Sequence, residues 1–163
     1  ILLRPTILDF PEDRACDTLD RQYMFGDSLL VAPIFKESGE VQYYLPEGTW
    51  YNLITGVEVI GGKWQKETHN YHSLPIMIRP NTILPLGAND QRPDYDYADG
   101  VTLVVSSFTD GAETTVEIPD LKGETVMTVT AKREEDQIRL KVRGGNGNYT
   151  VKSLSGMEVV VEE

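Results

Sequence analysis

The run Ser28-Leu29-Leu30-Val31-Ala32-Pro33-Ile34 decides the fold class of this chain. A short continuous apolar run of this kind is typical of a strand that is buried on both faces. Further short strand-like segments follow it, separated by turns that contain Gly or Pro, at residues 41–45, 49–53, 57–60, 72–77 and 82–86. Strands of this length at this spacing predict an antiparallel β-sandwich over residues 27–87.

A polar stretch without periodicity, residues 87–100, predicts a linker between two domains. Beyond it, segments that resemble strands recur at residues 101–107, 112–118, 125–132, 137–142, 148–153 and 158–161. Several of them alternate apolar and polar residues, which is typical of antiparallel strands with one face in water. Residues 88–163 are therefore expected to form a second antiparallel β-domain, in which the glycine-rich residues 144–148 are a hairpin turn.

The first 26 residues show a different pattern. Residues 1–10 are predicted to be extended, and the stretch from Pro11 to Gly26 is predicted to be a short helix, because Pro and acidic residues open it and Gly closes it. One strand followed by one helix predicts the last unit of a βα fold. Because the chain opens on Ile1 and further apolar residues, and not on Met, we expect it to be a fragment of a longer protein.

The composition limits the classes of function that the chain can have. Apolar residues make up 40% of the 163 residues and charged residues 25%, which is typical of a globular protein. The net charge of −11 repels phosphate backbones, so no nucleic-acid partner is expected. No apolar run approaches the ~20 residues that span a bilayer, so no membrane partner is expected either. The single cysteine, Cys16, is expected to be a small apolar residue.

Four motifs follow one another along the chain. They are Asp9-Phe10-Pro11, Tyr23-Met24-Phe25-Gly26-Asp27-Ser28-Leu29-Leu30-Val31-Ala32-Pro33, Tyr44-Leu45-Pro46-Glu47-Gly48-Thr49-Trp50 and Leu74-Pro75-Ile76-Met77-Ile78-Arg79-Pro80. In this order they resemble the region after the catalytic barrel in glycoside hydrolase family 31. The later Asn89-Asp90-Gln91-Arg92-Pro93-Asp94-Tyr95 resembles the bacterial α-xylosidase branch. The resemblance implies that residues 1–26 are the last strand and helix of a (β/α)8 barrel, that 27–87 form a proximal β-sandwich and that 88–163 form a distal β-domain.

The resemblance also implies a reaction for the parent enzyme, which is retaining hydrolysis of α-linked xylosides or glucosides by two carboxylates ~5–5.5 Å apart. The nucleophile segment of this branch, Lys-Thr-Asp-Phe-Gly-Glu, does not occur in this chain. No catalytic residue is therefore assigned. Asp9 and Glu12 lie near the end of the predicted strand, where barrel enzymes gather catalytic groups, but the family does not use these positions.

We therefore expect a non-catalytic C-terminal fragment of a glycosidase, inactive alone, which supports the barrel and the assembly of the enzyme. It is expected to need neither a cofactor nor a metal. Its expected partner is the missing catalytic barrel of the parent chain, and only the parent is expected to bind the oligosaccharide substrate. Formation of a homo-oligomer and location in the bacterial cytoplasm are further hypotheses.

Two polar motifs resemble metal sites but lack the full ligand pattern. His69 and His72 lie three residues apart, whereas zinc needs three or four ligands and no further His or Cys completes the set. The stretch Asp94-x-Asp96-x-x-Asp99-Gly100 resembles a calcium loop, but its third acid is one position late. We interpret the first motif as hydrogen-bonded or surface histidines and the second as an acidic linker.

Aromatic residues in the first β-domain provide an alternative function. Trp50 and Trp64 are candidates for stacking on sugar rings, although aromatic residues in short strands more commonly pack in cores or interfaces. The alternative hypothesis is therefore a stand-alone carbohydrate-binding β-sandwich module. A third hypothesis is a structural piece whose uncovered face is apolar and which self-associates through residues 1–35.

Overall fold

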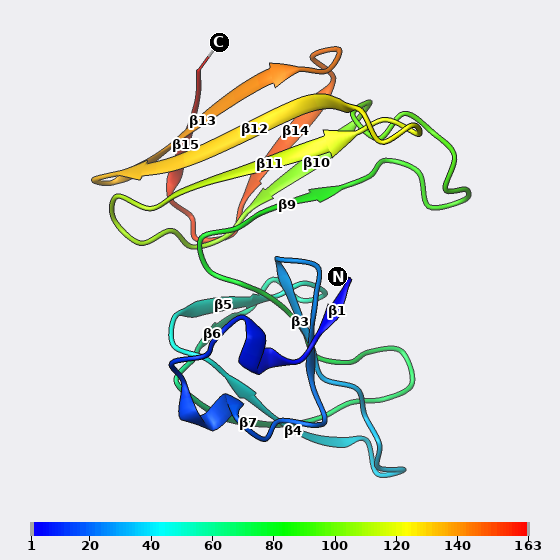
Figure 1. Ribbon diagram of the computed structural model, residues 1–163, viewed down its shortest axis with the longest axis vertical. Helices are drawn as coiled ribbons and strands as arrows, with labels where there is room; N and C mark the ends of the chain where they lie inside the picture. Colours follow the sequence, from blue (N-terminus) through cyan, green and yellow to red (C-terminus); the bar gives the residue numbers. More distant parts are fainter. Residues whose placement is uncertain (1, 163) are drawn as a thin grey trace. The chain divides into compact units, whose positions relative to one another are not determined.

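The computed structural model describes residues 2–162 and consists mainly of β-strands (Figure 1). It divides into two compact units, Ile1–Pro80 and Asn81–Glu163. Within the described range, helical structure is limited to two 3-10 turns, η1 (Thr6–Leu8) and η2 (Arg14–Cys16), and no helix has the length and apolar character that crossing a membrane requires. The expected mainly β class is confirmed. Ile1, which suggested a fragment, lies outside the described residues.

The first unit has two sheets. The larger one is antiparallel, and its strand order is β1 (Leu3–Arg4), β2 (Tyr23–Phe25), β3 (Leu29–Val31), β8 (Ile76–Ile78), β5 (Thr49–Asn52) and β6 (Glu58–Ile60). The smaller one pairs β4 (Glu40–Leu45) with β7 (Lys63–Thr68). Buried side chains of both sheets, among them Met24 and Leu30 from the larger and Tyr43 and Leu45 from the smaller, pack into one core.

The connection between β4 and β5 packs closely against this core. Trp50 is fully buried, and its indole N–H donates to the Pro46 carbonyl oxygen at 2.9 Å. Gly61 lies at the same corner, where a Cβ atom would overlap that carbonyl oxygen. Only glycine fits there without a shift of the backbone. A large aromatic ring whose N–H is satisfied is a strong contribution to a core of this size.

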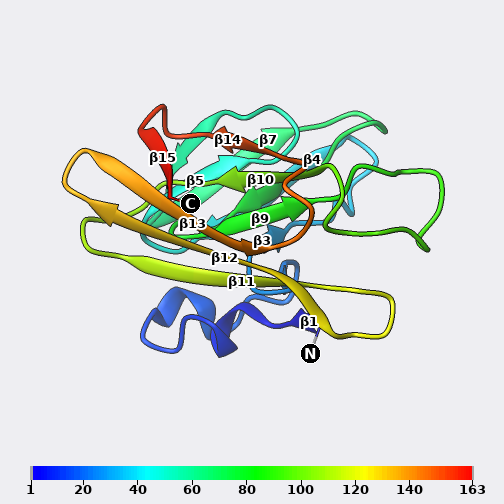
Figure 2. The same cartoon turned by 90° about the horizontal axis from the view of Figure 1, so that it is seen from above.

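The second unit is also built from two sheets. One has the strand order β14 (Tyr149–Ser153), β10 (Val101–Val105) and β9 (Ile83–Leu86), and the other has β11 (Glu113–Pro119), β12 (Thr125–Glu134), β13 (Gln137–Gly144) and β15 (Glu158–Glu162). Figure 2 shows the long strands β11, β12 and β13 side by side. Along β12 the buried side chains alternate, at Met127, Val129 and Ala131. Strands from both sheets contribute to one core.

The helix predicted between Pro11 and Gly26 is wrong. Only η2 is helical there, and Asp13 caps it by accepting a hydrogen bond from the Ala15 N–H at 3.0 Å. Residues Tyr23–Phe25 form β2, which pairs with β1 on one side and β3 on the other. These pairings place Met24 fully inside the core. Burial and strand pairing on both sides outweigh the weak helical preference of a short segment.

The domain limits and the strand pattern also differ from expectation. β9 pairs with β10, so the division falls at Pro80/Asn81 and not at residues 87/88. β1 and β2 share a sheet with β3, so residues 3–25 belong to the first unit instead of forming a separate strand and helix. β7 was not predicted because its residues are mostly polar and show no apolar alternation.

The sheets of the second unit are not purely antiparallel, because β10 and β14 run parallel, as do β13 and β15. The cause is the path of the chain. From β13 it crosses to the other sheet for β14 and then returns for β15. The glycine-rich residues 144–148 are therefore a connection between two sheets, and the predicted hairpin turn is wrong.

Trp50→Ala and Trp64→Ala form a matched pair, because these are the two tryptophans of the chain and both belong to the first unit. Trp50→Ala removes a fully buried ring, so we expect the free energy of unfolding of this unit to fall by about 3–5 kcal/mol. Trp64 is 60% exposed, and its replacement should cost about 1 kcal/mol or less. Urea unfolding followed by the fluorescence of the remaining tryptophan measures both losses. Equal losses would contradict this description of the core.

Candidate functional site

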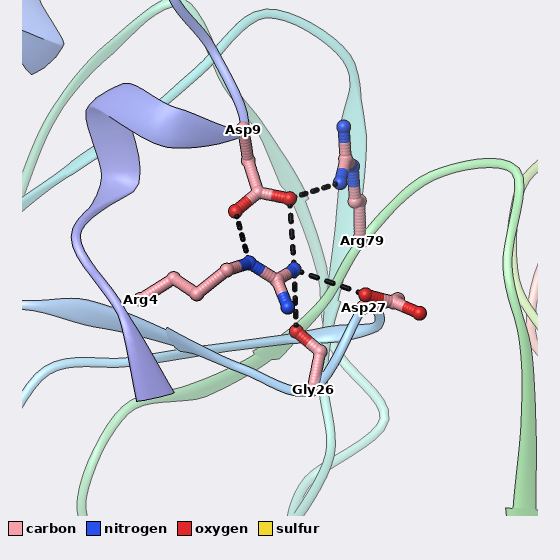
Figure 3. A network of polar contacts seen from close by, with 5 residues as sticks. All are labelled: Arg4, Asp9, Gly26, Asp27 and Arg79. Carbon is pink, nitrogen blue, oxygen red and sulfur yellow. Dashed lines mark hydrogen bonds and ion pairs between the residues drawn. The ribbon is translucent and has the colours of Figure 1, made fainter. Parts of the chain in front are cut away.

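The motif Asp9-Phe10-Pro11 directly follows η1 and is held in place by two arginines (Figure 3). Arg4 donates two hydrogen bonds, from Nε and Nη2 to the two carboxylate oxygens of Asp9, each 2.9 Å long. Arg79, which follows β8, reaches the same carboxylate at 3.3 Å. Contacts in which one guanidinium holds both oxygens of a carboxylate are strong and directional. This network connects the beginning of the first unit to its last strand.

Arg4 also contacts the turn between β2 and β3. Its Nη2 donates to the Gly26 carbonyl oxygen at 3.1 Å and to the Asp27 carboxylate at 3.0 Å. The guanidinium carbon of Arg79 lies 4.4 Å from the centre of the Phe10 ring, which is a cation–π contact. Phe10 in turn packs against the core of the first unit. The charged network therefore continues into the apolar interior.

The electrostatic setting of Asp9 suits a structural role. The hydrogen bonds from Arg4, together with the positive charges of both arginines, lower the pKa of Asp9 below its ordinary value. The same carboxylate raises the pKa of Arg4. A general acid for glycoside hydrolysis needs a raised pKa, whereas the pKa of Asp9 is lowered.

An open depression of about 980 Å³ lies beside Asp9 on the first unit. The acidic residues that line it are Asp9, Glu12, Asp13 and Glu47. Asp13 is committed to two contacts, because one oxygen accepts from the Ala15 N–H and the other from the Tyr44 hydroxyl, both at 3.0 Å. Glu12 and Glu47 are exposed. The two acids that are held in a fixed position therefore serve local structure.

The structure corrects the stacking role that was predicted for Trp50. Its ring is fully buried and offers no face to a sugar, so Trp50 is a core residue. Trp64, in β7, is exposed and packs against Tyr44 with ring centres 5.7 Å apart. It borders a groove of about 240 Å³, here called the Trp64 groove, whose other lining residues are residues 18–22, Pro33, Phe35, Lys36 and residues 40–42.

The other polar motifs take part in local contacts. The Nε2 atom of His69 lies 2.7 Å from the Glu67 carboxylate. The Asp99 carboxylate accepts hydrogen bonds from the side-chain amides of Asn146 and Asn148, at 2.8 and 2.9 Å, and these bonds lower the pKa of Asp99. Among residues 2–162, no group of three or more His, Cys, Asp and Glu side chains is arranged to hold a metal ion.

Sequence reasoning missed the partners that hold these sites in place. Arg4 and Arg79 are far apart in the sequence, and nothing in their spacing indicates that they meet at Asp9. Gln22 is also unmarked in the sequence, yet it is buried and pairs with the backbone of Tyr44. Its side-chain amide donates to the Tyr44 carbonyl oxygen and accepts from the Tyr44 N–H, both at 2.8 Å.

Models of two protein domains match the chain. The glycosyl hydrolase family 31 C-terminal domain matches residues 1–84, and the C-terminal domain of the α-xylosidase YicI matches residues 96–163. An α-xylosidase from Emericella nidulans is 37% identical over 90% of this chain, and α-xylosidase XylQ from Lactiplantibacillus pentosus is 30% identical over 92%. The chain spans 20% of the length of each of these two relatives.

A solved structure shares the fold. The crystal structure of a family 31 α-xylosidase from Xanthomonas citri matches 99% of this chain with a TM-score of 0.71. The sequence identity is 24%, and the match covers 18% of that enzyme. A likeness at this identity supports the architecture described above, with strands as the main element of both units.

Asp9→Asn should weaken the first unit far more than Asp27→Asn, although both side chains contact Arg4. Asp9 is 12% exposed, and its replacement leaves two arginines without their shared anion, so we expect a loss of about 1.5–3 kcal/mol in the free energy of unfolding. Asp27 is 93% exposed, and the expected loss there is below about 1 kcal/mol. Urea unfolding at pH 7, followed by tryptophan fluorescence, compares the two.

The contribution of Asp9 should also depend on pH. Because its folded pKa is depressed, the stabilisation is present above the unfolded pKa of about 3.9 and is lost as the pH falls through the folded value. The difference in stability between the unaltered chain and Asp9→Asn should therefore be constant from pH 7 to about pH 5 and narrow below about pH 4. A difference that widened in acid, or equal losses for Asp9→Asn and Asp27→Asn, would contradict the network.

Proposed function

The chain belongs to glycosyl hydrolase family 31, and from this premise we propose that it is the non-catalytic C-terminal part of an enzyme that hydrolyses α-linked xylosides. Its role is to support the catalytic barrel of that enzyme. The observation that carries the proposal is the state of Asp9, which lies beside an open depression of the first unit and is bound by two arginines. Hydrogen bonds and positive charges of this kind favour the ionised carboxylate, which does not suit a general acid.

The substrate class rests on the relatives. The model of an α-xylosidase C-terminal domain matches residues 96–163, and two relatives that align with nearly the whole chain are named α-xylosidases. Because the chain spans one fifth of their length, the reaction is proposed for a longer enzyme. That reaction is retaining hydrolysis, in which a pair of carboxylates on the barrel acts as the nucleophile and as the acid/base group.

A patch of exposed apolar side chains gives the supporting role a physical basis. Leu3 in β1 and Phe25 in β2 are cross-strand neighbours, 54% and 40% exposed. This exposed pair is here called the β1 patch. β1 is also the edge strand of the six-stranded sheet. Exposed apolar edges of this kind attract another chain segment, and the segment proposed here is the catalytic barrel of the same enzyme.

The isolated chain should hydrolyse neither 4-nitrophenyl α-xyloside nor 4-nitrophenyl α-glucoside, because the proposed carboxylate pair belongs to the barrel. The measurement is nitrophenol release at high concentrations of the purified chain, with a complete family 31 α-xylosidase as the positive control. Turnover that remains with the chain through successive purification steps and that falls in the Asp9→Asn variant would overturn the non-catalytic role.

Leu3→Asp should reduce self-association of the isolated chain, whereas Val57→Asp should not. Without the barrel, the β1 patch is expected to contact a second copy of the chain, and a charge at Leu3 opposes this contact. Val57 is as exposed as Leu3 but lies next to β6, at the opposite edge of the sheet. Sedimentation velocity over a range of concentrations measures the effect. An unaltered chain that is monomeric at every concentration, or equal effects of both substitutions, would argue against the patch.

A further inference from the structure

The Trp64 groove takes no part in the supporting role proposed above. Its lining includes residues 40–42 of β4 and Trp64 of the neighbouring strand β7. In the register of these strands Trp64 lies opposite Tyr44, and Lys66 lies opposite Gln42. Residues that lie opposite each other, or two apart on one strand, share a face of the sheet. An exposed aromatic ring is therefore followed along one face by groups that form hydrogen bonds.

The Trp64 ring packs against a side chain that is itself held in place. Trp64 packs against Tyr44 with an angle of 61° between the ring planes. Tyr44 is itself held at two places, by Gln22 at its backbone and by Asp13 at its hydroxyl. A ring that is already in place loses little conformational freedom when a ligand binds to it. The platform is therefore pre-organised for stacking.

The charges in the groove indicate a neutral ligand. Its lining includes two acidic residues, Asp20 and Glu40, and two basic ones, Arg21 and Lys36, whereas the whole chain has a net charge of −11. Glu40 also forms ion pairs with Lys36 and Lys66. Sugar hydroxyls donate and accept hydrogen bonds, so they match a surface that mixes carboxylates, ammonium groups and an amide. An apolar segment placed there would remove water from these polar groups without offering them new hydrogen bonds.

We propose that the Trp64 groove binds one or two rings of a neutral oligosaccharide, stacked on Trp64 with hydroxyls directed to Gln42 and Glu40. The C–H groups on one face of a pyranose are attracted to the negative face of an aromatic ring. The volume of about 240 Å³ lies just below the roughly 300–1,000 Å³ of pockets for drug-sized ligands, which limits the bound part to one or two rings. This proposal rests on the proposed function only for the choice of sugar.

Such a site would hold an oligosaccharide near the enzyme while another part of the same molecule is hydrolysed. Two weak sites on one polypeptide raise the effective concentration of a ligand that reaches both. The ligand class that benefits is therefore a branched or extended oligosaccharide with α-linked xylose, and not a free monosaccharide.

Nuclear magnetic resonance titration of the ¹⁵N-labelled chain with a neutral xylosylated gluco-oligosaccharide tests the proposal. The two indole N–H signals provide an internal comparison. The Trp64 signal should shift and saturate with a dissociation constant on the order of 1 mM. The Trp50 signal should stay in place, because that N–H is buried and bonded to Pro46.

Two variants separate stacking from nonspecific association. Trp64→Ala should weaken binding by at least about tenfold, read from the backbone amide of Gln42. Tyr71→Ala removes an aromatic ring that is 99% exposed but lies outside the Trp64 groove. This variant should bind the oligosaccharide with the same affinity as the unaltered chain. Urea unfolding of both variants checks that the first unit remains folded.

Three results would overturn the proposal. The first is the absence of a shift of the Trp64 signal up to about 20 mM oligosaccharide, which is about twentyfold above the expected dissociation constant. The second is an unchanged affinity for the oligosaccharide in Trp64→Ala. The third is an equal loss of affinity in Tyr71→Ala and Trp64→Ala. None of these readouts involves turnover or self-association. Sedimentation can therefore contradict the supporting role without affecting the sugar site, and the titration can contradict the sugar site without affecting the supporting role.

Discussion

The Asp9 carboxylate is the point on which the first unit depends. Arg4 and Arg79 meet at this one anion, and Arg4 also holds the turn between β2 and β3. The next residue, Phe10, lies under the Arg79 guanidinium and packs against the core. A sheltered ion network stabilises a fold only while each charge keeps its partners. The motif around Asp9 therefore connects segments of the first unit that are distant in the sequence.

Two of the acids beside the depression of the first unit are engaged in local contacts. The charge of Asp9 is paired with those of two arginines, and Asp13 accepts hydrogen bonds from Tyr44 and from the backbone of η2. The same contact of Asp13 with Tyr44 steadies the ring on which Trp64 rests. Support of the barrel and binding of a sugar at the Trp64 groove are thus proposed for one unit, and both depend on contacts that keep its loops in place.

The alternation and spacing of apolar residues were sufficient to predict a mainly β chain, and strands such as β4 and β5 were placed closely because Pro and Gly turns flank them. The helix was wrong because apolar residues at helical spacing also suit a strand once Met24 is paired on both sides. Trp50 and Trp64 look alike in the sequence. Only packing separates them, since Trp50 lies under the corner at Pro46 and Trp64 lies on the outer face of β7. The meeting of Arg4, Asp9 and Arg79 leaves no periodic signal at all.

The catalytic constant of the Asp9→Asn variant tests the central claim most directly. It should be measured with an aryl α-xyloside, in an enzyme that carries this chain as its C-terminal part and at a temperature well below its unfolding transition. If Asp9 is a structural joint, the catalytic constant should stay within about twofold of the unaltered enzyme while the unfolding temperature falls. A loss of about 10⁴-fold in the catalytic constant of the folded variant, as expected when a catalytic group is removed, would contradict the account.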